Sequence, residues 1–188
     1  MTSFKPIADQ KGFVLWMTGL SGAGKTTIAE ILEGELKARR LRVERLDGDI
    51  VRQRLTNDLG FSKEDRTKNI ERVTFVAKLL SRNGVAVLCS FISPYQAIRD
   101  SVRSQTTNFV EVFVDADLDT LIERDVKGLY KKALAGEIEN FTGISDPFEP
   151  PTDPEIHVHT EEQTPVQSAN QILAYLEDVG LVPYANLY

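Results

Sequence analysis

The segment Gly19-Leu-Ser-Gly-Ala-Gly-Lys25-Thr26 constrains the fold most, because it matches G-x-x-x-x-G-K-[ST] at every specified position. It follows an apolar run over residues 13–17 and precedes a helical pattern over 25–39. A strand, a glycine loop and a helix in this order predict a P-loop, in which backbone N–H groups and a helix N-terminus surround phosphate. A flexible glycine turn that binds nothing is the alternative, and the flanking strand and helix argue against it.

Short apolar runs alternate with longer amphipathic stretches along the rest of the chain, which predicts a parallel sheet covered by helices. The predicted strands are 13–17, 42–46, 85–90, 109–114 and 155–159, and the predicted helices are 25–39, 50–57, 65–82, 95–103, 118–125 and 166–179. We therefore expect one α/β domain over residues 1–188, a three-layer P-loop NTPase fold with a five-stranded parallel sheet. Residues 1–11 would form an N-terminal arm.

The stretch 126–154 interrupts this alternation, since it mixes lysines and glycines with Pro147, Pro150, Pro151 and Pro154. Loops of this length in a folded domain often serve as lids over an active site. The proline run is also compatible with a ligand for a proline-recognising module. We favour the lid, because prolines in loops usually only fix the path of the chain.

The net charge, the lack of long apolar segments and the single cysteine argue against several classes of function. The net charge of −6 argues against non-specific binding to nucleic acid or to an anionic membrane surface. The first ten residues lack a signal-peptide pattern and no run has the length of a membrane span, so we expect a cytoplasmic protein. The single cysteine, Cys89, lies in an apolar run, which predicts a buried core residue rather than a catalytic thiol.

Acidic residues follow two predicted strands. Asp47 and Asp49 end the second strand, where ligands of α/β sheets bind, so either carboxylate could hold Mg²⁺ or deprotonate a hydroxyl. A helix N-cap is the alternative role for Asp49. Asp115 and Asp117 follow the fourth strand and precede a helix, for which capping is the simpler explanation.

Basic residues cluster after Asp49. Arg52 is three residues further on, and Arg66, Asn69 and Arg72 share one face of a predicted helix. Guanidinium groups from two elements can clamp a phosphate or sulfate group through paired hydrogen bonds. A solvated helix face paired with neighbouring glutamates is the alternative, and the residues alone leave both open.

The motifs beyond the P-loop resemble those of adenylylsulfate kinases, which are P-loop kinases of small molecules. They occur in that family's order from residue 12 onward, and several are more specific than the P-loop. The matching segments are Leu46-Asp-Gly-Asp-x-x-Arg52, Asp58-Leu-Gly-Phe-Ser62, Asp65-Arg66 with Asn69, Phe91-Ile-Ser-Pro-Tyr95, Lys127-Gly-Leu-Tyr-Lys131 and Asn140-Phe-Thr-Gly-Ile144.

This resemblance implies transfer of the γ-phosphate of ATP to the 3′-hydroxyl of adenylylsulfate, with Mg²⁺ as the metal. The matching positions make Lys25, Asp49 and Lys127 catalytic, and Thr26 and Asp49 metal-binding. Arg124 would stack on the base of ATP, and the phosphates would bind the loop residues Gly19, Leu20, Ser21, Gly22, Ala23, Gly24, Lys25, Thr26 and Thr27.

On the acceptor side, the resemblance implies that arginine and asparagine side chains grip the phosphosulfate and ribose, and that two phenylalanines sandwich the adenine. Ser93 also matches a serine reported as a phosphorylation site in the family, although direct in-line transfer needs no phosphoserine intermediate. The predicted adenylylsulfate-binding residues are Asp49, Arg52, Phe61, Arg66, Asn69, Ile92, Ser93, Lys127 and Phe141.

The resemblance further implies a homodimer and suggests functional coupling to ATP sulfurylase. Two rival functions stay open, namely a P-loop kinase acting on another small hydroxyl compound and a regulatory module that binds nucleotide without turnover. His157 and His159 alternate on the last predicted strand and face one side of it. With no third ligand at a convincing spacing, we expect a structural role for them rather than a metal site.

Overall fold

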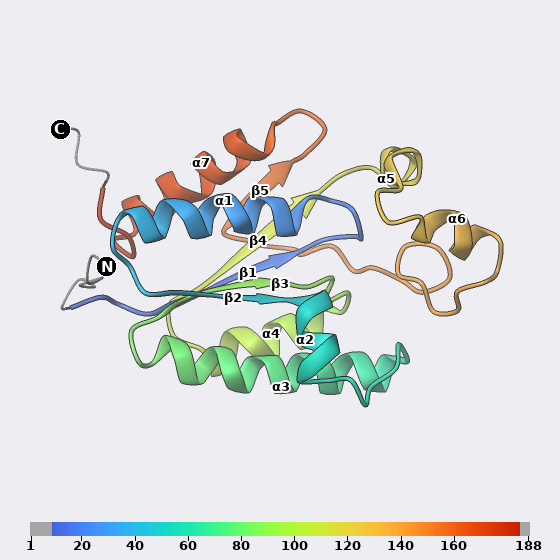
Figure 1. The fold of residues 1–188 in the computed structure, drawn as a ribbon, viewed down its shortest axis with the longest axis horizontal. Coiled ribbons are helices and arrows are strands. Elements are labelled where there is room, and N and C mark those ends of the chain that lie inside the picture. The colour runs from blue at the N-terminus through green and yellow to red at the C-terminus, as the bar shows by residue number, and fades with distance from the viewer. Residues whose placement is uncertain (1–8, 185–188) are drawn as a thin grey trace, which may run out of the picture.

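Five parallel strands form the centre of the structure, a computed structural model that describes residues 9–184 (Figure 1). The order of the strands across the sheet is β2-β3-β1-β4-β5. The strands are β1 (Phe13–Thr18), β2 (Val43–Asp47), β3 (Ala86–Ser90), β4 (Phe109–Asp115) and β5 (Ile156–His159). Because β1 lies between β3 and β4, the loop after β1 leaves the middle of the sheet, where α/β folds bind their ligands.

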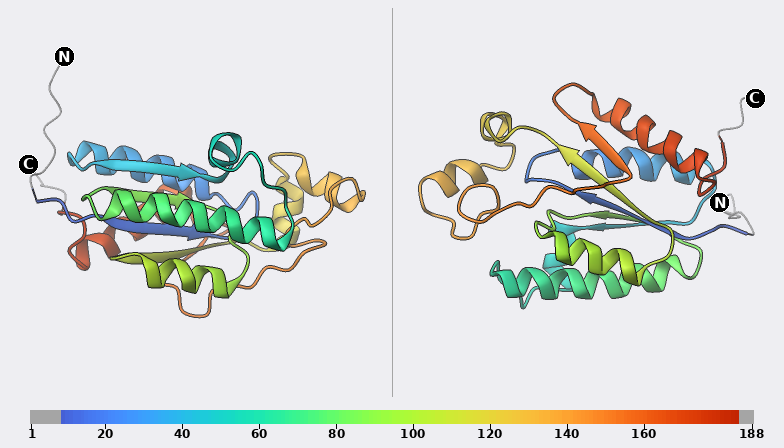
Figure 2. Two further views of the ribbon diagram at one scale, coloured as in Figure 1. Left: turned by 90° about the horizontal axis from the view of Figure 1, so that it is seen from below. Right: turned by 180° about the vertical axis from the view of Figure 1, so that it is seen from behind.

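Helices cover both faces of the sheet (Figures 1 and 2). The helices α1 (Lys25–Ala38) and α7 (Pro165–Asp178) pack together on one face, and α3 (Lys63–Ser81) and α4 (Gln96–Gln105) pack together on the other. Three short helices lie toward the carboxyl ends of the strands, namely α2 (Gly48–Arg54), α5 (Leu118–Arg124) and α6 (Leu129–Leu134). The predicted three-layer fold is confirmed.

The alternation of side chains along β1 divides the core into two layers. Leu15 and Met17 belong to the cluster that α1 and α7 complete, whereas Val14 and Trp16 belong to the cluster on the side of α3. All six residues of β1 are buried, as expected of a strand in the middle of a parallel sheet. Cys89 is also buried, as predicted, and burial raises the pKa of its thiol.

The structure corrects several element boundaries. The helix predicted over 50–57 begins at Gly48, because the Asp47 side chain accepts a hydrogen bond from the backbone N–H of Asp49 and caps it. The capping role considered for Asp49 therefore belongs to Asp47. The stretch 126–154 contains the helix α6, which the sequence analysis did not predict. Most of the arm predicted over residues 1–11 lies outside the described residues. Among residues 9–184, no helix is long and apolar enough to cross a bilayer.

Candidate active site

The loop between β1 and α1 is shaped by glycines with positive φ. Gly19 has φ 146°, and a Cβ there would lie 2.1 Å from the carbonyl oxygen of Val114, so only glycine allows this approach to β4. Gly24 has φ 101° and is the N-cap of α1. The loop therefore turns its backbone toward the N-terminus of a 14-residue helix, which is a favourable environment for an anion.

The side chain of Lys25 is hydrogen-bonded to the backbone of this loop. Its Nζ donates hydrogen bonds to the carbonyl oxygens of Gly19 (2.8 Å) and Leu20 (2.7 Å). Burial of the ammonium group, followed by the nearby charge of Lys127, lowers its pKa to about 7. A bound polyphosphate would favour the charged form of Lys25, so phosphate binding and protonation are coupled here.

Thr26 and Asp47 bring two oxygen ligands together beside the loop. The Thr26 hydroxyl donates to Asp47 Oδ2 at 2.8 Å, and the Asp47 side chain is buried. Hydroxyl and carboxylate oxygens are the donors that Mg²⁺ prefers, so this pair fits the metal. The structure thus brings Asp47, rather than Asp49, into contact with Thr26, and a metal-binding role for Asp49 stays a prediction.

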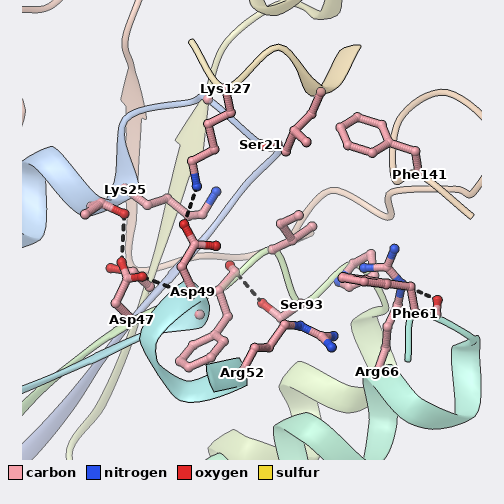
Figure 3. A pocket seen from close by; sticks show the side chains of 18 of the residues that line it. Ser21, Lys25, Asp47, Asp49, Arg52, Phe61, Arg66, Ser93, Lys127 and Phe141 are labelled. Carbon is pink, nitrogen blue, oxygen red and sulfur yellow. Dashed lines mark hydrogen bonds and ion pairs between the residues drawn. The ribbon is translucent and has the colours of Figure 1, made fainter. Parts of the chain in front are cut away.

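A cavity of about 550 Å³ runs from this loop along the carboxyl ends of β2 and β3 and beneath the segment 126–141 (Figure 3). Asp49 lies in it opposite Lys127, whose Nζ is 2.5 Å from Asp49 Oδ2. The cavity gathers most of the residues predicted from the sequence, including Ser21, Gly22, Gly24, Lys25, Thr26, Thr27, Asp49, Arg52, Phe61, Arg66, Asn69, Ile92, Ser93, Lys127 and Phe141.

Two guanidinium groups flank Phe61 at the far end of this cavity. The Arg52 guanidinium lies 4.3 Å from the centre of the Phe61 ring, and that of Arg66 lies 5.7 Å from it. Burial lowers the pKa of both arginines, and for Arg52 the neighbouring Arg66 charge lowers it further. Two guanidinium groups next to one exposed aromatic ring are the kind of arrangement that suits an aromatic anion.

The neighbouring residues of α3 divide between the cavity and the surface. Asn69 is buried, and its Oδ1 accepts a hydrogen bond from Thr56 at 2.7 Å. Arg72, which the sequence places on the same helix face, instead makes two hydrogen bonds to Asp58 at the surface. Of the arginines considered for an anion site, Arg52 and Arg66 therefore lie together in the cavity and Arg72 does not, and anion binding by the first two stays a prediction.

The segment after α5 is fastened over the loop and the cavity. Tyr130 of α6 donates a hydrogen bond to the carbonyl oxygen of Ser21 at 2.8 Å, and its ring packs edge-on against Phe141. Arg66 donates to the carbonyl oxygen of Asn140 at 2.6 Å and lies 3.8 Å from Asp146. Phe141 is buried beside the cavity, while Phe61 is exposed, so the two rings border the cavity from different elements.

Ser93 lies in the wall of the cavity, where its backbone has φ 39°. Its Oγ accepts a hydrogen bond from the Trp16 indole (3.0 Å) and donates one to the Thr18 hydroxyl (3.1 Å). The side chain is buried, so a phosphoryl group on Oγ would disrupt both contacts. Phosphorylation of Ser93 stays a prediction. The carbonyl oxygen of Ile92 accepts from the same Thr18 hydroxyl at 2.6 Å.

A second cavity of about 240 Å³ lies on the other side of the glycine loop. Arg124 lines it together with Ala23 and Thr27, and its guanidinium donates to the carbonyl oxygen of Thr160 at 3.1 Å. Among the residues predicted to bind ATP, Arg124 is thus placed apart from the acceptor end. Further residues of this cavity were not predicted from the sequence, namely Thr160, Gln163 and Pro165.

Some residues of the site carried no recognisable signal in the sequence. Asp146 accepts a hydrogen bond from the Tyr95 hydroxyl at 2.9 Å and faces Arg66. It therefore supports the arginine from the covering segment, by which we mean residues 126–154. Nothing around Asp146 in the sequence indicates this partnership, because 80 residues separate it from Arg66. Asn140 could have been noted, since it begins a matched motif.

The capping role expected of Asp115 and Asp117 is wrong. Asp117 occupies the N-cap position of α5, but its side chain accepts no capping hydrogen bond. Asp115 Oδ2 instead lies 3.0 Å from His157 Nε2 on the adjacent strand. The parallel pairing of β4 with β5, which brings these side chains together, also overturns the premise that the two histidines have no third partner.

A phosphate loop that shares one cavity with a second cationic and aromatic subsite is the arrangement of a P-loop kinase of small molecules. The family model for adenylylsulphate kinase matches residues 11–159. The chain belongs to the adenylylsulphate kinase family.

Three relatives illustrate the similarity. A probable adenylyl-sulfate kinase of Pseudomonas aeruginosa is 73% identical over 165 residues, which cover 88% of this chain and 77% of that protein. The APS kinase structure of Mycobacterium tuberculosis in complex with AMPPNP and APS is 39% identical, with a TM-score of 0.87, and the match covers 90% of this chain and 99% of that one. A probable bifunctional SAT/APS kinase of Sorangium cellulosum is 58% identical over 92% of this chain and 30% of that protein.

Proposed function

We propose that the chain transfers the γ-phosphate of ATP to the 3′-hydroxyl of adenylylsulfate, which gives ADP and 3′-phosphoadenylylsulfate. One observation carries the proposal. A single cavity holds the glycine loop with Lys25 at one end and Arg52, Arg66 and Phe61 at the other. The relative from Mycobacterium tuberculosis, solved with AMPPNP and APS, supports the assignment of two nucleotides to such a site.

On the donor side, backbone N–H groups of the glycine loop and the ammonium group of Lys25 bind the β- and γ-phosphates. Thr26 and Asp47 would hold Mg²⁺, which when bound neutralises charge on the phosphates. The base of ATP extends into the second cavity, where Arg124 stacks on it.

On the acceptor side, Arg52 and Arg66 bind the phosphosulfate group, because paired guanidinium hydrogen bonds suit planar arrays of anionic oxygens. Phe61 and Phe141 contact the adenine, and Asn69, Ile92 and Ser93 form the adjoining wall.

The chemical step uses two side chains that already face each other. Asp49 orients the 3′-hydroxyl and takes its proton as the oxygen attacks the γ-phosphorus in line with the leaving ADP. Lys127 leaves its ion pair with Asp49 and binds the oxygens of the γ-phosphoryl group while it is transferred.

The segment 126–154 acts as the lid that excludes water from this step. Tyr130 already ties it to Ser21 of the glycine loop, and Arg66 ties it to Asn140. When acceptor is present, such a lid keeps the γ-phosphate from being lost to hydrolysis.

Three wider assignments belong to the same proposal. We place the enzyme in the cytoplasm, as a homodimer, and functionally coupled to ATP sulfurylase. The existence of a bifunctional SAT/APS kinase among the relatives supports the last of these. The dimer is tested by measuring the mass of the protein in solution.

A coupled assay of ADP release tests the reaction. We expect ADP to form in proportion to added adenylylsulfate, and mass spectrometry to show one phosphate added to that nucleotide. Equal ADP release with and without adenylylsulfate would contradict the acceptor assignment. Tight ATP binding with no phosphorylated product from any acceptor would indicate a regulatory module.

A further inference from the structure

Both histidines of the chain lie on β5, side by side and facing one carboxylate of β4. His157 and His159 are separated by one residue, so they project from the same face of the strand. The pairing register places Phe113 opposite His157 and Asp115 opposite His159. The buried Ile156 and Val158 alternate with the histidines and point into the core, which leaves the imidazoles on the outer face.

Three ligand atoms converge on this face. Asp115 Oδ2 lies 3.0 Å from His157 Nε2 and 3.9 Å from His159 Nδ1. One ligand atom from each of the three residues lies within 4.8 Å of the other two. Ligands bound to one tetrahedral ion at 2.0–2.1 Å are separated by about 3.3 Å. The two distances from Asp115 Oδ2, 3.0 and 3.9 Å, lie on either side of that spacing.

The imidazoles are held in this arrangement by a row of stacked rings. Phe148 stacks on Phe113 with their centres 5.9 Å apart, Phe113 stacks on His157 at 4.7 Å, and His157 lies 4.1 Å from His159. The strand itself is fixed, since the carbonyl oxygen of His157 accepts a hydrogen bond from Gln171 of α7. Ligands that are positioned before binding lose less conformational freedom when the ion arrives.

We propose that Asp115, His157 and His159 form a binding site for a divalent transition-metal ion, for which Zn²⁺ is the best match. Two imidazoles and one carboxylate suit borderline ions such as Zn²⁺ and Co²⁺, whereas Mg²⁺ prefers oxygen ligands alone. Three protein ligands leave a fourth position for water. This site is separate from the Mg²⁺ position at Thr26 and Asp47, and it does not depend on the proposed reaction.

A metal here would connect the ends of two adjacent strands next to the second cavity. Thr160 follows His159, and both its N–H and its hydroxyl donate to the carbonyl oxygen of Asp115. The carbonyl oxygen of Thr160 in turn accepts from Arg124. An ion that joins Asp115 to His159 would therefore stabilise the edge strand β5 and steady Thr160 in the wall of that cavity.

The two histidines make the test direct, because no other imidazole competes for the metal in an untagged chain. The protein is treated with a chelator, kept in excess Mg²⁺ to occupy the oxygen-ligand site, and titrated with Zn²⁺. Nitrogen-15 NMR of the imidazole rings reports binding at this place, and isothermal titration gives the stoichiometry. We expect one equivalent of Zn²⁺ to shift the ring signals of both histidines and to raise the melting temperature.

Two variants and a control separate this site from binding elsewhere. We expect Asp115→Asn and His159→Gln each to weaken Zn²⁺ binding at least about tenfold. Asp119→Asn removes a nearby exposed carboxylate outside the cluster and should bind Zn²⁺ as the unmodified protein does. Ring signals that stay in place with Zn²⁺ in excess, or an Asp115→Asn protein with unchanged affinity, would overturn the proposal and leave an imidazole–carboxylate hydrogen bond only.

Discussion

Lys127 Nζ lies 2.5 Å from Asp49 Oδ2, so a residue of the covering segment is paired with the carboxylate that follows β2, 78 residues earlier. The two side chains are 48% and 67% exposed. An ion pair this exposed contributes about 0–1 kcal/mol to stability. The pair can therefore open at little cost, as the proposed move of Lys127 from Asp49 to the phosphoryl group requires.

Replacement of Lys127 by methionine should impair catalysis without unfolding the protein. We expect kcat to fall about 100-fold, because a cation near the transferred group is lost. The melting temperature should change by less than about 3 °C. Lys132→Met, which removes an exposed charge of the same segment, serves as the control. Equal losses of kcat in the two variants would contradict a specific role for Lys127.

Asp47 and Asp49 should respond differently to conversion into asparagine. Asp47→Asn should keep the cap of α2, since asparagine also caps helices, but it should weaken the proposed metal site with Thr26. We expect it to raise the Mg²⁺ concentration needed for half-maximal rate. Asp49→Asn should lower kcat with little change in that concentration. Steady-state kinetics at varied Mg²⁺ measure both, and the reverse pattern would make Asp49 the metal ligand.

Arg52→Ala should damage the use of adenylylsulfate selectively. Loss of charge-assisted hydrogen bonds worth about 1.5–3 kcal/mol predicts a KM for adenylylsulfate about 10- to 100-fold higher. The KM for ATP should hardly change. Arg54→Ala is the matched control, because Arg54 is exposed and lies outside the cavity. Parallel increases in both KM values for Arg52→Ala would argue against a dedicated acceptor subsite.

Nucleotide binding should take up a proton at alkaline pH. Burial, followed by the charge of Lys127, lowers the pKa of Lys25 to about 7, so in the free protein at about pH 8.5 its amine is mostly neutral. A triphosphate favours the ammonium form, and binding should therefore draw a proton from the buffer. Isothermal titration of ATP in two buffers with different ionisation enthalpies measures this uptake.

The same shift has a consequence for stability. Between about pH 7 and about pH 10.5 the unfolded chain carries a proton on Lys25 that the folded chain has lost, so this group makes stability rise with pH in that window. Lys25→Met should abolish both the proton uptake and this part of the pH dependence. A binding enthalpy at about pH 8.5 that is the same in both buffers would show that Lys25 is already charged.

The buried pair Arg99–Glu111 should be essential to stability. Arg99 Nε donates to Glu111 Oε1 at 2.9 Å, and both side chains are almost completely buried. Glu111→Gln leaves the arginine charge without its partner, so the free energy of unfolding should fall by about 3 kcal/mol or more. Glu64→Gln breaks only the exposed pair with Lys68 and should cost less than about 0.5 kcal/mol. Urea denaturation compares them, and similar values would contradict the prediction.

Local patterns were sufficient to predict most of the fold. The five strands and the glycine loop depend on short apolar runs and on turn residues that are adjacent in the sequence. The N-cap of α3 also depends on neighbouring residues, because the Ser62 side chain accepts a hydrogen bond from the N–H of Asp65.

Features that depend on strand pairing or on the path of a long loop could not be predicted in this way. The contact of Asp115 with His157 requires the register of β4 and β5, which nothing near either residue specifies. Arg99 lies in a polar stretch of the sequence, which suggests an exposed side chain. It is buried instead, because it donates hydrogen bonds to Glu111 and to the carbonyl oxygens of Ser93 and Glu149. The helix α6 was not predicted, because it has only six residues and glycines lie close to both of its ends, at Gly128 and Gly136.

A crystal structure with ADP, Mg²⁺ and adenylylsulfate bound together tests the two-nucleotide site most directly. We expect the phosphates of ADP in the loop before Lys25, the phosphosulfate group against the guanidinium groups of Arg52 and Arg66, and the adenine between Phe61 and Phe141. Adenylylsulfate bound in another place, with Arg52 and Arg66 directed into solvent, would contradict it.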